Sequence, residues 1–202
     1  LAGRVFRDPA DGDVVEVGER MRLTVVATPG HTFTHLSYAL ADLGPGADAG
    51  AHKDVGVFSG GSLLFGATGR PDLLGADHTD ALVRHQHASA HRLADLLPDD
   101  AEVFPTHGFG SFCSATQSDA TSSTIGRERT SNPVLTQDEE SYVRELLAGL
   151  GAWPAYYAHM APANAAGPAA PDLSPPALAD ATELRRRIEA GEWVVDLRNR
   201  TT

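Results

Sequence analysis

Two histidines follow short apolar segments at turns, where a rigid scaffold can hold a side chain toward a ligand. His31 comes after a Pro-Gly turn in TPGHTFTHLSY (residues 28–38), and His107 is the third residue of the glycine-rich PTHGFGSFC (residues 105–113). Imidazole is the commonest protein ligand for metals such as zinc and non-haem iron, and loops after strands often carry reactive groups. One imidazole needs partners from elsewhere in the fold, and two histidines in similar places after strands favour a metal site.

Four further histidines, His78, His85, His87 and His91, lie in a segment with helical spacing. His87 and His91 have the spacing that can share a metal on one helix face, but no Glu completes an HExxH pattern. We therefore expect a solvated helix face. Cys113 could be a reactive thiol, but isolated cysteines are more often buried and inert.

The elements that must position these groups begin with short strands. Residues 13–28 contain two apolar runs separated by residues 18–20, Gly-Glu-Arg, which is typical of a hairpin. Residues 36–41 and 55–59 are further apolar runs bounded by Gly and Asp, and residues 102–104 form a brief run ahead of His107. The N-terminal half is therefore expected to be rich in β-structure.

Helices are predicted on both sides of the His107 loop. No Gly or Pro interrupts residues 77–97, and their leucines recur near helical spacing, so we expect a long helix that ends at Pro98. Residues 136–139, Thr-Gln-Asp-Glu, match a capping box, which predicts a second helix to about Gly149. Together with the strands, these helices indicate an α+β layered domain.

A change of composition then marks a boundary. Residues 161–176 are rich in Pro and Ala and offer little to pack, which indicates a linker. Asp180 caps a further predicted helix, and residues 193–198 (WVVDLR) have the pattern of a strand. We expect a second domain to begin after the linker.

Composition and charge narrow the class of protein. The chain has 202 residues with 42% hydrophobic side chains and a net charge of −11, which opposes binding to nucleic acid or anionic lipid. No stretch approaches the roughly 20 apolar residues of a membrane span. The single cysteine fits a reducing compartment, so a cytoplasmic location is expected. The first residues lack an initiator Met and a signal peptide, and we interpret the start as a truncation.

Four motifs occur in an order and spacing that resemble a known family. These are TPGHT, FSGGSLL (residues 58–64), GRPDL (residues 69–73) and PTHGFGSFC. The set resembles the persulfide dioxygenase branch of the metallo-β-lactamase superfamily, including members fused to rhodanese domains, and DLR at 196–198 is similar to a rhodanese strand.

The resemblance implies an architecture with three parts. Residues 1–160 would be the C-terminal half of a metallo-β-lactamase αββα sandwich, and residues 161–176 the linker. Residues 177–202 would be the first helix and strand of a rhodanese-like α/β domain.

The resemblance also implies metal ligands. In the family, the histidine that matches His31 binds the active-site metal, and the one that matches His107 faces the second metal position of binuclear relatives. Because both histidines follow strands and both match these positions, we expect them to open into one pocket at one edge of the sheet. The family's HxHxDH motif, which supplies further ligands, is absent from these residues. Gly61 stands where the family has the aspartate of a TGD motif, so a carboxylate ligand is missing. Restoring Asp at position 61 is accordingly expected to raise iron affinity.

Neighbouring residues are expected to support the site. His35 more plausibly orients the TPGHT loop than binds metal, and Arg70 and Asp72 are expected to hold a loop by charge-assisted hydrogen bonds. Asp72 is the nearest motif carboxylate to the missing ligand, so a role in metal binding is the alternative.

Three functions fit these features. The first, which the resemblance implies, is an iron-dependent oxidation by oxygen of a small thiol or persulfide substrate such as glutathione persulfide, giving sulfite and thiol. The second is a zinc-dependent thioester hydrolase resembling hydroxyacylglutathione hydrolase, and the third is a metal-poor scaffold or sulfur-relay domain, which the glycine at position 61 favours. The 202-residue chain alone is expected to bind no metal tightly and to be inactive, and the sequence leaves the oligomeric state open.

Overall fold

The computed structural model describes residues 8–44, 53–107, 120–152, 154–167, 170–175 and 177–195. The chain divides into two compact units, Leu1–Tyr157 and Ala158–Thr202. The first unit contains a five-stranded sheet with helices packed against it, and the second contains helical segments.

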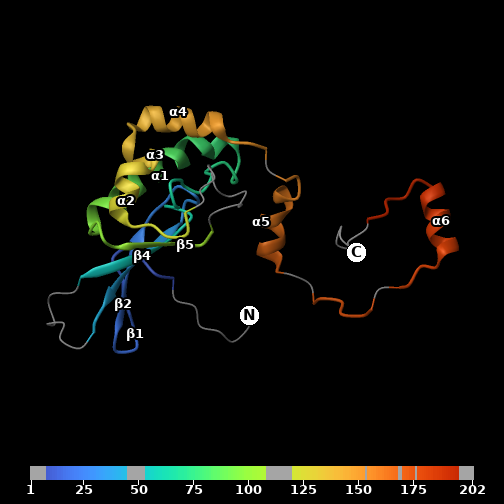
Figure 1. Cartoon of the computed structure of the whole chain (residues 1–202), viewed down its shortest axis with the longest axis horizontal. Helices are drawn as coiled ribbons and strands as arrows, with labels where there is room; N and C mark the ends of the chain where they lie inside the picture. Colours follow the sequence, from blue (N-terminus) through green and yellow to red (C-terminus); the bar gives the residue numbers. More distant parts are fainter. Residues whose placement is uncertain are drawn as a thin grey trace. The chain divides into compact units, whose positions relative to one another are not determined.

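The sheet of the first unit follows the chain order (Figure 1). Its strands are β1 (Val14–Val17), β2 (Met21–Ala27), β3 (Leu36–Asp42), β4 (Asp54–Gly60) and β5 (Glu102–Pro105). The first four strands pair antiparallel, whereas β4 and β5 pair parallel, because a helix connects them. The five predicted strands are confirmed, including the hairpin turn, where Gly18 has a φ of 64°.

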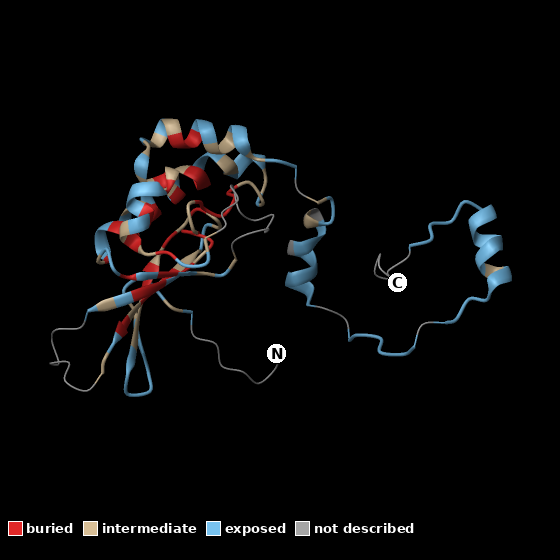
Figure 2. Ribbon diagram, viewed as in Figure 1, coloured by how far each residue is buried: buried red, intermediate tan, exposed pale blue. Residues whose placement is uncertain are grey.

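Four helices cover one face of this sheet. They are α1 (Ala76–Leu96), α2 (Ile125–Ser131), α3 (Pro133–Thr136) and α4 (Glu139–Gly149). The predicted long helix is α1, whose last turn is followed by Pro98. Buried residues concentrate where the helices meet the sheet (Figure 2). The core joins Ala39, Val57 and Val103 of the strands to apolar residues of the helices, among them Val83, Leu93, Ile125, Val134 and Val143.

The predicted capping box differs from the observed cap of α4. Thr136 is the last residue of α3, and the cap of α4 is Asp138, whose Oδ1 accepts from the Ser141 backbone N–H at 3.0 Å. The short helix α3 begins at Pro133 and takes up Thr136, the residue that the prediction assigned to the cap. An aspartate at the position before Glu139 satisfies the same orphan N–H groups.

The opposite face of the sheet carries large apolar residues in cross-strand register. Tyr38 pairs with Phe58, which pairs with Phe104 across β3, β4 and β5. The Phe58 and Phe104 rings lie 5.4 Å apart and their residues are 44% and 37% exposed. Within the described residues, this face is therefore apolar but only partly covered.

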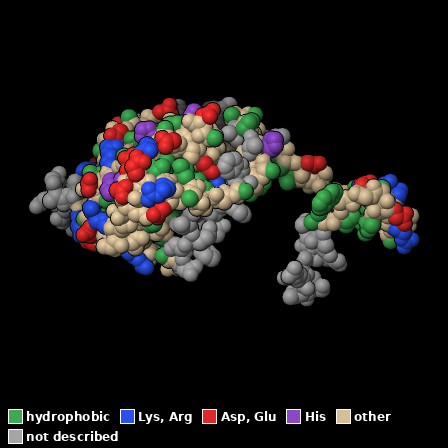
Figure 3. Space-filling view, turned by 90° about the horizontal axis from the view of Figure 1, so that it is seen from above, with side chains coloured by type: hydrophobic (Ala, Val, Ile, Leu, Met, Phe, Trp, Pro, Cys, Tyr) green, Lys and Arg blue, Asp and Glu red, His purple; other side chains and the backbone are tan. Residues whose placement is uncertain are grey.

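The outer surface of the helical layer mixes acidic and basic side chains (Figure 3). Arg84 of α1 donates through Nη1 to Glu139 at 2.7 Å and to Glu140 at 2.6 Å, both at the start of α4. These side chains are exposed or half-exposed, so each ion pair contributes little to stability. The pairs lie where α1 meets the start of α4.

The second unit is helical and largely exposed. Helix α5 (Tyr157–Ala166) extends into the predicted linker and contains Pro162. Helix α6 (Ala181–Glu189) begins where predicted, because Asp180 Oδ1 accepts from the N–H groups of Thr182 and Glu183 at 2.9 and 2.8 Å. Residues 193–195 of the predicted strand are described and are not in a strand, and residues 196–198 lie outside the described residues.

A membrane-spanning helix requires length and apolar character together. Among the described residues, none of the helices combines the two to the degree that crossing a bilayer demands.

Candidate functional site

The loop between β2 and β3 carries His31 and is seated on α1. The Thr28 N–H donates to the His35 carbonyl at 2.9 Å, which closes the loop at its base. Gly30 has a φ of 149°, and a Cβ at this position would lie 2.5 Å from Gln86 Cα on α1. Only glycine permits this approach, so the residue before His31 rests directly on the helix.

The His31 imidazole lies in a slot between two glycine backbones. A Cβ on Gly61 would come within 2.5 Å of His31 Cδ2, and a Cβ on Gly69 within 2.8 Å of His31 Nδ1. His31 Nδ1 lies 2.9 Å from the Arg70 carbonyl oxygen. Because a carbonyl only accepts, Nδ1 carries the proton and the Nε2 lone pair stays available for a ligand. Metal-binding histidines commonly use this arrangement.

His35 uses both of its ring nitrogens in hydrogen bonds. The Gly61 N–H donates to His35 Nε2 at 3.1 Å, so Nδ1 carries the proton and donates to Thr28 Oγ1 at 2.9 Å. The Thr28 hydroxyl then donates to Ser37 Oγ at 2.8 Å, and Ser37 donates to the Ser59 carbonyl at 3.4 Å. His35 thus links three segments and has no nitrogen free for a metal.

His107 follows β5 and lies beside His31. The two ring centroids are 5.8 Å apart, and the Thr106 N–H donates to the Gly60 carbonyl at 3.2 Å, which joins the ends of β4 and β5. His107 Nδ1 is buried and has no hydrogen-bond partner among the described residues. The structure therefore brings together the two histidines that the sequence predicted to share a pocket.

The three histidines line one open cavity of about 340 Å³ together with Leu36, Tyr38, Phe58, Gly60, Gly61 and Thr106. Burial lowers the pKa of His31, and burial together with the neighbouring His31 lowers that of His107. Burial, assisted by the charges of the other two rings, lowers the pKa of His35 to about 4. All three rings are therefore neutral at pH 7, which is the protonation state that metal binding requires.

The described residues supply part of a metal site. His31 Nε2 and the buried, unpartnered His107 Nδ1 are suited to a metal, but no group of three or more His, Cys, Asp or Glu side chains within the described ranges could enclose one. Two imidazoles alone complete neither a closed nor a catalytic ligand set. The role of His31 and His107 as metal ligands remains a prediction.

Arg70 and Asp72 form a bidentate ion pair. Arg70 Nε and Nη2 donate to the two Asp72 carboxylate oxygens at 2.8 Å each, and Nη2 also donates to the Gly151 carbonyl at 2.6 Å. Both side chains are largely buried. Because both Asp72 oxygens are engaged, the geometry favours the loop-holding role over metal binding.

The structure argues against the expected benefit of an aspartate at position 61. The His31 ring occupies the space that a Cβ on Gly61 would need, and the hydrogen bond to Arg70 holds that ring in place. Substituting Asp would therefore require the His31 ring or the backbone at position 61 to shift. The missing carboxylate and the position of His31 are therefore linked through packing, which the sequence pattern did not reveal.

The histidines of α1 fall into two groups, and one expectation is wrong. His78 and His85 are exposed as expected, but His87 and His91 are half-buried. Their rings stack 4.4 Å apart, and the His87 ring lies 5.6 Å from that of Tyr142 on α4. The sequence pattern missed this because α3 and α4 cover the α1 face that carries these two rings.

Other predicted residues lie outside the described part of the chain. Cys113 and the rest of the glycine-rich loop, residues 108–113, fall in the range 108–119, so the prediction about the thiol stays a prediction. Sequence reasoning also missed Gln86, a fully buried polar residue of α1 that contacts the His31 slot. A lone Gln in an amphipathic helix gives no signal of such a contact.

No family model matches the chain, but curated proteins and solved structures are similar to it. The chain is 31% identical over 134 residues to human mitochondrial persulfide dioxygenase ETHE1. The aligned region covers 66% of this chain and 43% of that protein. A Staphylococcus aureus metallo-β-lactamase structure matches with a TM-score of 0.68 and 31% identity, covering 78% of this chain and 44% of that one. ETHE1 from Myxococcus xanthus matches with a TM-score of 0.58 and 27% identity, over 77% of this chain and 58% of that one.

The fold is therefore that of the metallo-β-lactamase superfamily. More particularly, the chain is homologous to persulfide dioxygenases of the ETHE1 type. It spans about half the length of the curated relatives it matches.

Proposed function

We propose that this chain contributes to a metal-dependent enzyme of sulfur metabolism, which oxidises a small persulfide such as glutathione persulfide to sulfite and thiol. The observation that carries the proposal is the pair of neutral imidazoles of His31 and His107, each with a nitrogen available at one cavity. The persulfide dioxygenases among its relatives support the substrate class.

In this proposal, His31 Nε2 and His107 would hold an iron ion, with further ligands from outside the described residues. Iron would supply the redox chemistry with oxygen. His35 keeps the His31 loop against β4 through its contact with Gly61, and the cavity wall of Leu36, Tyr38 and Phe58 offers the substrate sulfur an apolar surface.

A zinc-dependent thioester hydrolase is the second candidate, because the same imidazole pair suits zinc, which activates water. The chain is also 29% identical over 109 residues to a Polaromonas hydroxyacylglutathione hydrolase, covering 54% of this chain and 35% of that protein. The third candidate is a metal-poor scaffold or sulfur-relay domain, favoured by Gly61, which offers no side-chain ligand.

The C-terminal region belongs to the same proposal. We propose that residues 177–202 begin a rhodanese-like module that handles the same sulfur, and the support is the helix α6 with its Asp180 cap at the predicted position. A cytoplasmic location is proposed on the single cysteine of the chain.

The test compares the two reactions on the intact protein loaded with iron or zinc. Oxygen consumption and sulfite formation are measured with glutathione persulfide, and thioester cleavage with S-lactoylglutathione. The dioxygenase proposal expects iron-dependent oxygen uptake that falls in His31→Gln by more than the roughly 100-fold that loss of an outer-shell partner can cost. It should persist in His85→Gln, which changes an exposed histidine. Zinc-dependent thioester cleavage without oxygen uptake would favour the hydrolase, and neither activity would favour the scaffold.

A further inference from the structure

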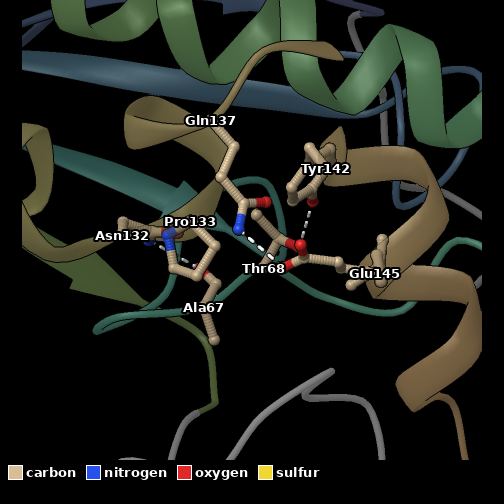
Figure 4. A pocket seen from close by; sticks show the side chains of 8 residues that line it. Ala67, Thr68, Asn132, Pro133, Gln137, Tyr142 and Glu145 are labelled. Atoms are coloured by element: carbon tan, nitrogen blue, oxygen red, sulfur yellow. Dashed lines mark hydrogen bonds between the residues drawn. The ribbon is translucent and has the colours of Figure 1, made fainter. Parts of the chain in front are cut away.

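Gln86 is a polar side chain buried in the middle of α1, and both its amide nitrogen and its amide oxygen are hydrogen-bonded. It is 0% exposed, and its Nε2 donates to the Gly69 carbonyl at 2.6 Å. Its Oε1 accepts from the Tyr142 hydroxyl at 3.1 Å, and Tyr142 accepts from Thr68 Oγ1 at 2.8 Å. Figure 4 shows the Thr68 and Tyr142 hydroxyls turned toward each other. A buried amide that loses its hydrogen-bond partners is strongly unfavourable, so these bonds fix its orientation.

The backbone of Gln86 contacts the loop that carries His31. Gly30, the residue before His31, approaches so closely that a Cβ there would lie 2.5 Å from both Gln86 Cα and Cβ. One turn further along α1, Ser89 Oγ donates to the Pro29 carbonyl at 2.7 Å. The approach of the His31 loop is therefore set by this part of α1.

The side chain of Gln86 holds the other wall of the His31 slot. Gly69 receives the Gln86 amide on its carbonyl, donates its own N–H to the Gly61 carbonyl at 2.8 Å, and packs against the His31 ring. The next carbonyl along the chain, that of Arg70, accepts the His31 Nδ1 proton. Gln86 thus contacts both the loop that carries His31 and the Gly69–Arg70 segment, whose Arg70 carbonyl accepts the His31 proton.

We propose that Gln86 is a positioning residue for His31: it fixes the Gly69–Arg70 backbone so that His31 donates through Nδ1 and presents Nε2 to the cavity. The relevance of this role to catalysis rests on the proposed function. The position and protonation of the His31 ring do not rest on the proposed function, since they can be measured without substrate or metal.

The test is the ring tautomer of His31, read from long-range ¹H–¹⁵N correlations of the intact metal-free protein at pH 8. The wild type should show the Nδ1–H tautomer. Gln86→Met, which keeps the length of the side chain but cannot hydrogen-bond, should convert part or all of His31 to Nε2–H. Gln137→Met is the matched control, because Gln137 donates to Glu145 at 2.6 Å and has no bond to the His31 slot (Figure 4).

Cobalt(II) binding provides the second readout. Gln86→Met should weaken affinity about 10- to 100-fold, as found for groups that orient metal ligands, while Gln137→Met leaves it unchanged. A folded Gln86→Met protein with unaltered His31 tautomer would overturn the proposal. A wild type in the Nε2–H tautomer would overturn it even if the variant failed to fold. If the tautomer changes but the wild type catalyses neither reaction, the positioning role stands and the proposed function fails.

Discussion

The two compact units differ in what holds their helices in place. In the first unit, α1 buries Leu82, Val83 and Leu93 completely, and its polar Gln86 is enclosed as well. In the second, α6 has no buried residue, and Leu178 and Trp193 on either side of it are 99% and 95% exposed. The difference teaches that α1 is specified by contacts distant in sequence, whereas α6 is specified by local signals.

The local signals of α6 are complete within the helix and its cap. Asp180 satisfies two N–H groups at the start, and Glu183 pairs with Arg186 at 2.9 Å and with Arg187 at 2.8 Å. Such exposed pairs each contribute a few tenths of a kcal/mol, so α6 is marginal by itself. The following predictions use this contrast.

The largest effect is expected in the core of the first unit. Leu93→Ala should lower the free energy of unfolding by about 2 to 5 kcal/mol, because it opens a cavity between α1 and the sheet. Leu178→Ala, which removes the same groups at a fully exposed position of the second unit, should change it by less than about 0.5 kcal/mol. Urea unfolding followed by circular dichroism measures both, and equal losses would contradict the contrast.

A smaller loss is expected at the slot of His31. Gly61→Ala should cost about 1 to 3 kcal/mol, since its Cβ overlaps the His31 ring and either the ring or the backbone must move. Gly149→Ala at the end of α4 is the matched control, because a Cβ there meets nothing within 4 Å. Urea unfolding midpoints of Gly61→Ala and Gly149→Ala measure the difference in stability. An unchanged NMR signal of the His31 ring in Gly61→Ala would refute the overlap.

Acid should destabilise the first unit but not the pairs of α6. The pKa of His35 is about 4 in the fold against 6.5 unfolded, so its contribution is complete above pH 6.5 and is lost as pH falls toward 4. Because the ring is partly exposed, we expect a loss of about 1 to 2 kcal/mol by pH 4.5. The Arg186 and Arg187 partners lower the pKa of Glu183 to about 2, so α6 keeps its pairs there.

Unfolding curves between pH 8 and pH 4.5 check the acid effect. His35→Gln should flatten the dependence on pH, whereas His85→Gln, at an exposed position, should leave it unchanged. A profile that is equally steep in both variants would assign the effect to other groups.

The smallest effect is expected at the cap of α6. Asp180→Ala should reduce the stability of this helix by about 1 kcal/mol, because two N–H groups lose their acceptor. Backbone chemical shifts of α6 report the loss of helix. The unfolding midpoint of the first unit should stay unchanged, and a shift there would mean that α6 is coupled to the core.

Sequence patterns predicted the elements whose signals are local and strong. The hairpin around Gly18, the uninterrupted helix α1 and the capped helix α6 all fall in this group. The short helices α2 and α3 were not predicted, because Asn132 and Pro133 interrupt the pattern and each helix is only one or two turns long. Their stability comes instead from burial, as with Ile125 and Val134 at 0% exposure.

The candidate site divides in the same way. Their positions after strand ends, together with the resemblance to a known family, predicted that His31 and His107 meet. The half-buried state of His87, the packing of Gly61 against His31 and the role of Gln86 depend on which segments meet in space. No spacing along the chain encodes these contacts.

Tyr38, Phe58 and Phe104 form a row of aromatic residues across the face of the sheet opposite the helices. This row affects the register that the strands adopt as they fold. Side chains alternate between faces, so shifting β4 by one residue would turn Phe58 toward α1 and Val57 away from it. The face beneath α1 is built from small residues such as Ser37, Ala39 and Ala41, all fully or nearly buried, so a phenyl ring there would overpack it. A β4 strand shifted by one residue would therefore pack poorly against α1. The size difference between the two faces of the sheet thus favours the observed register of β4.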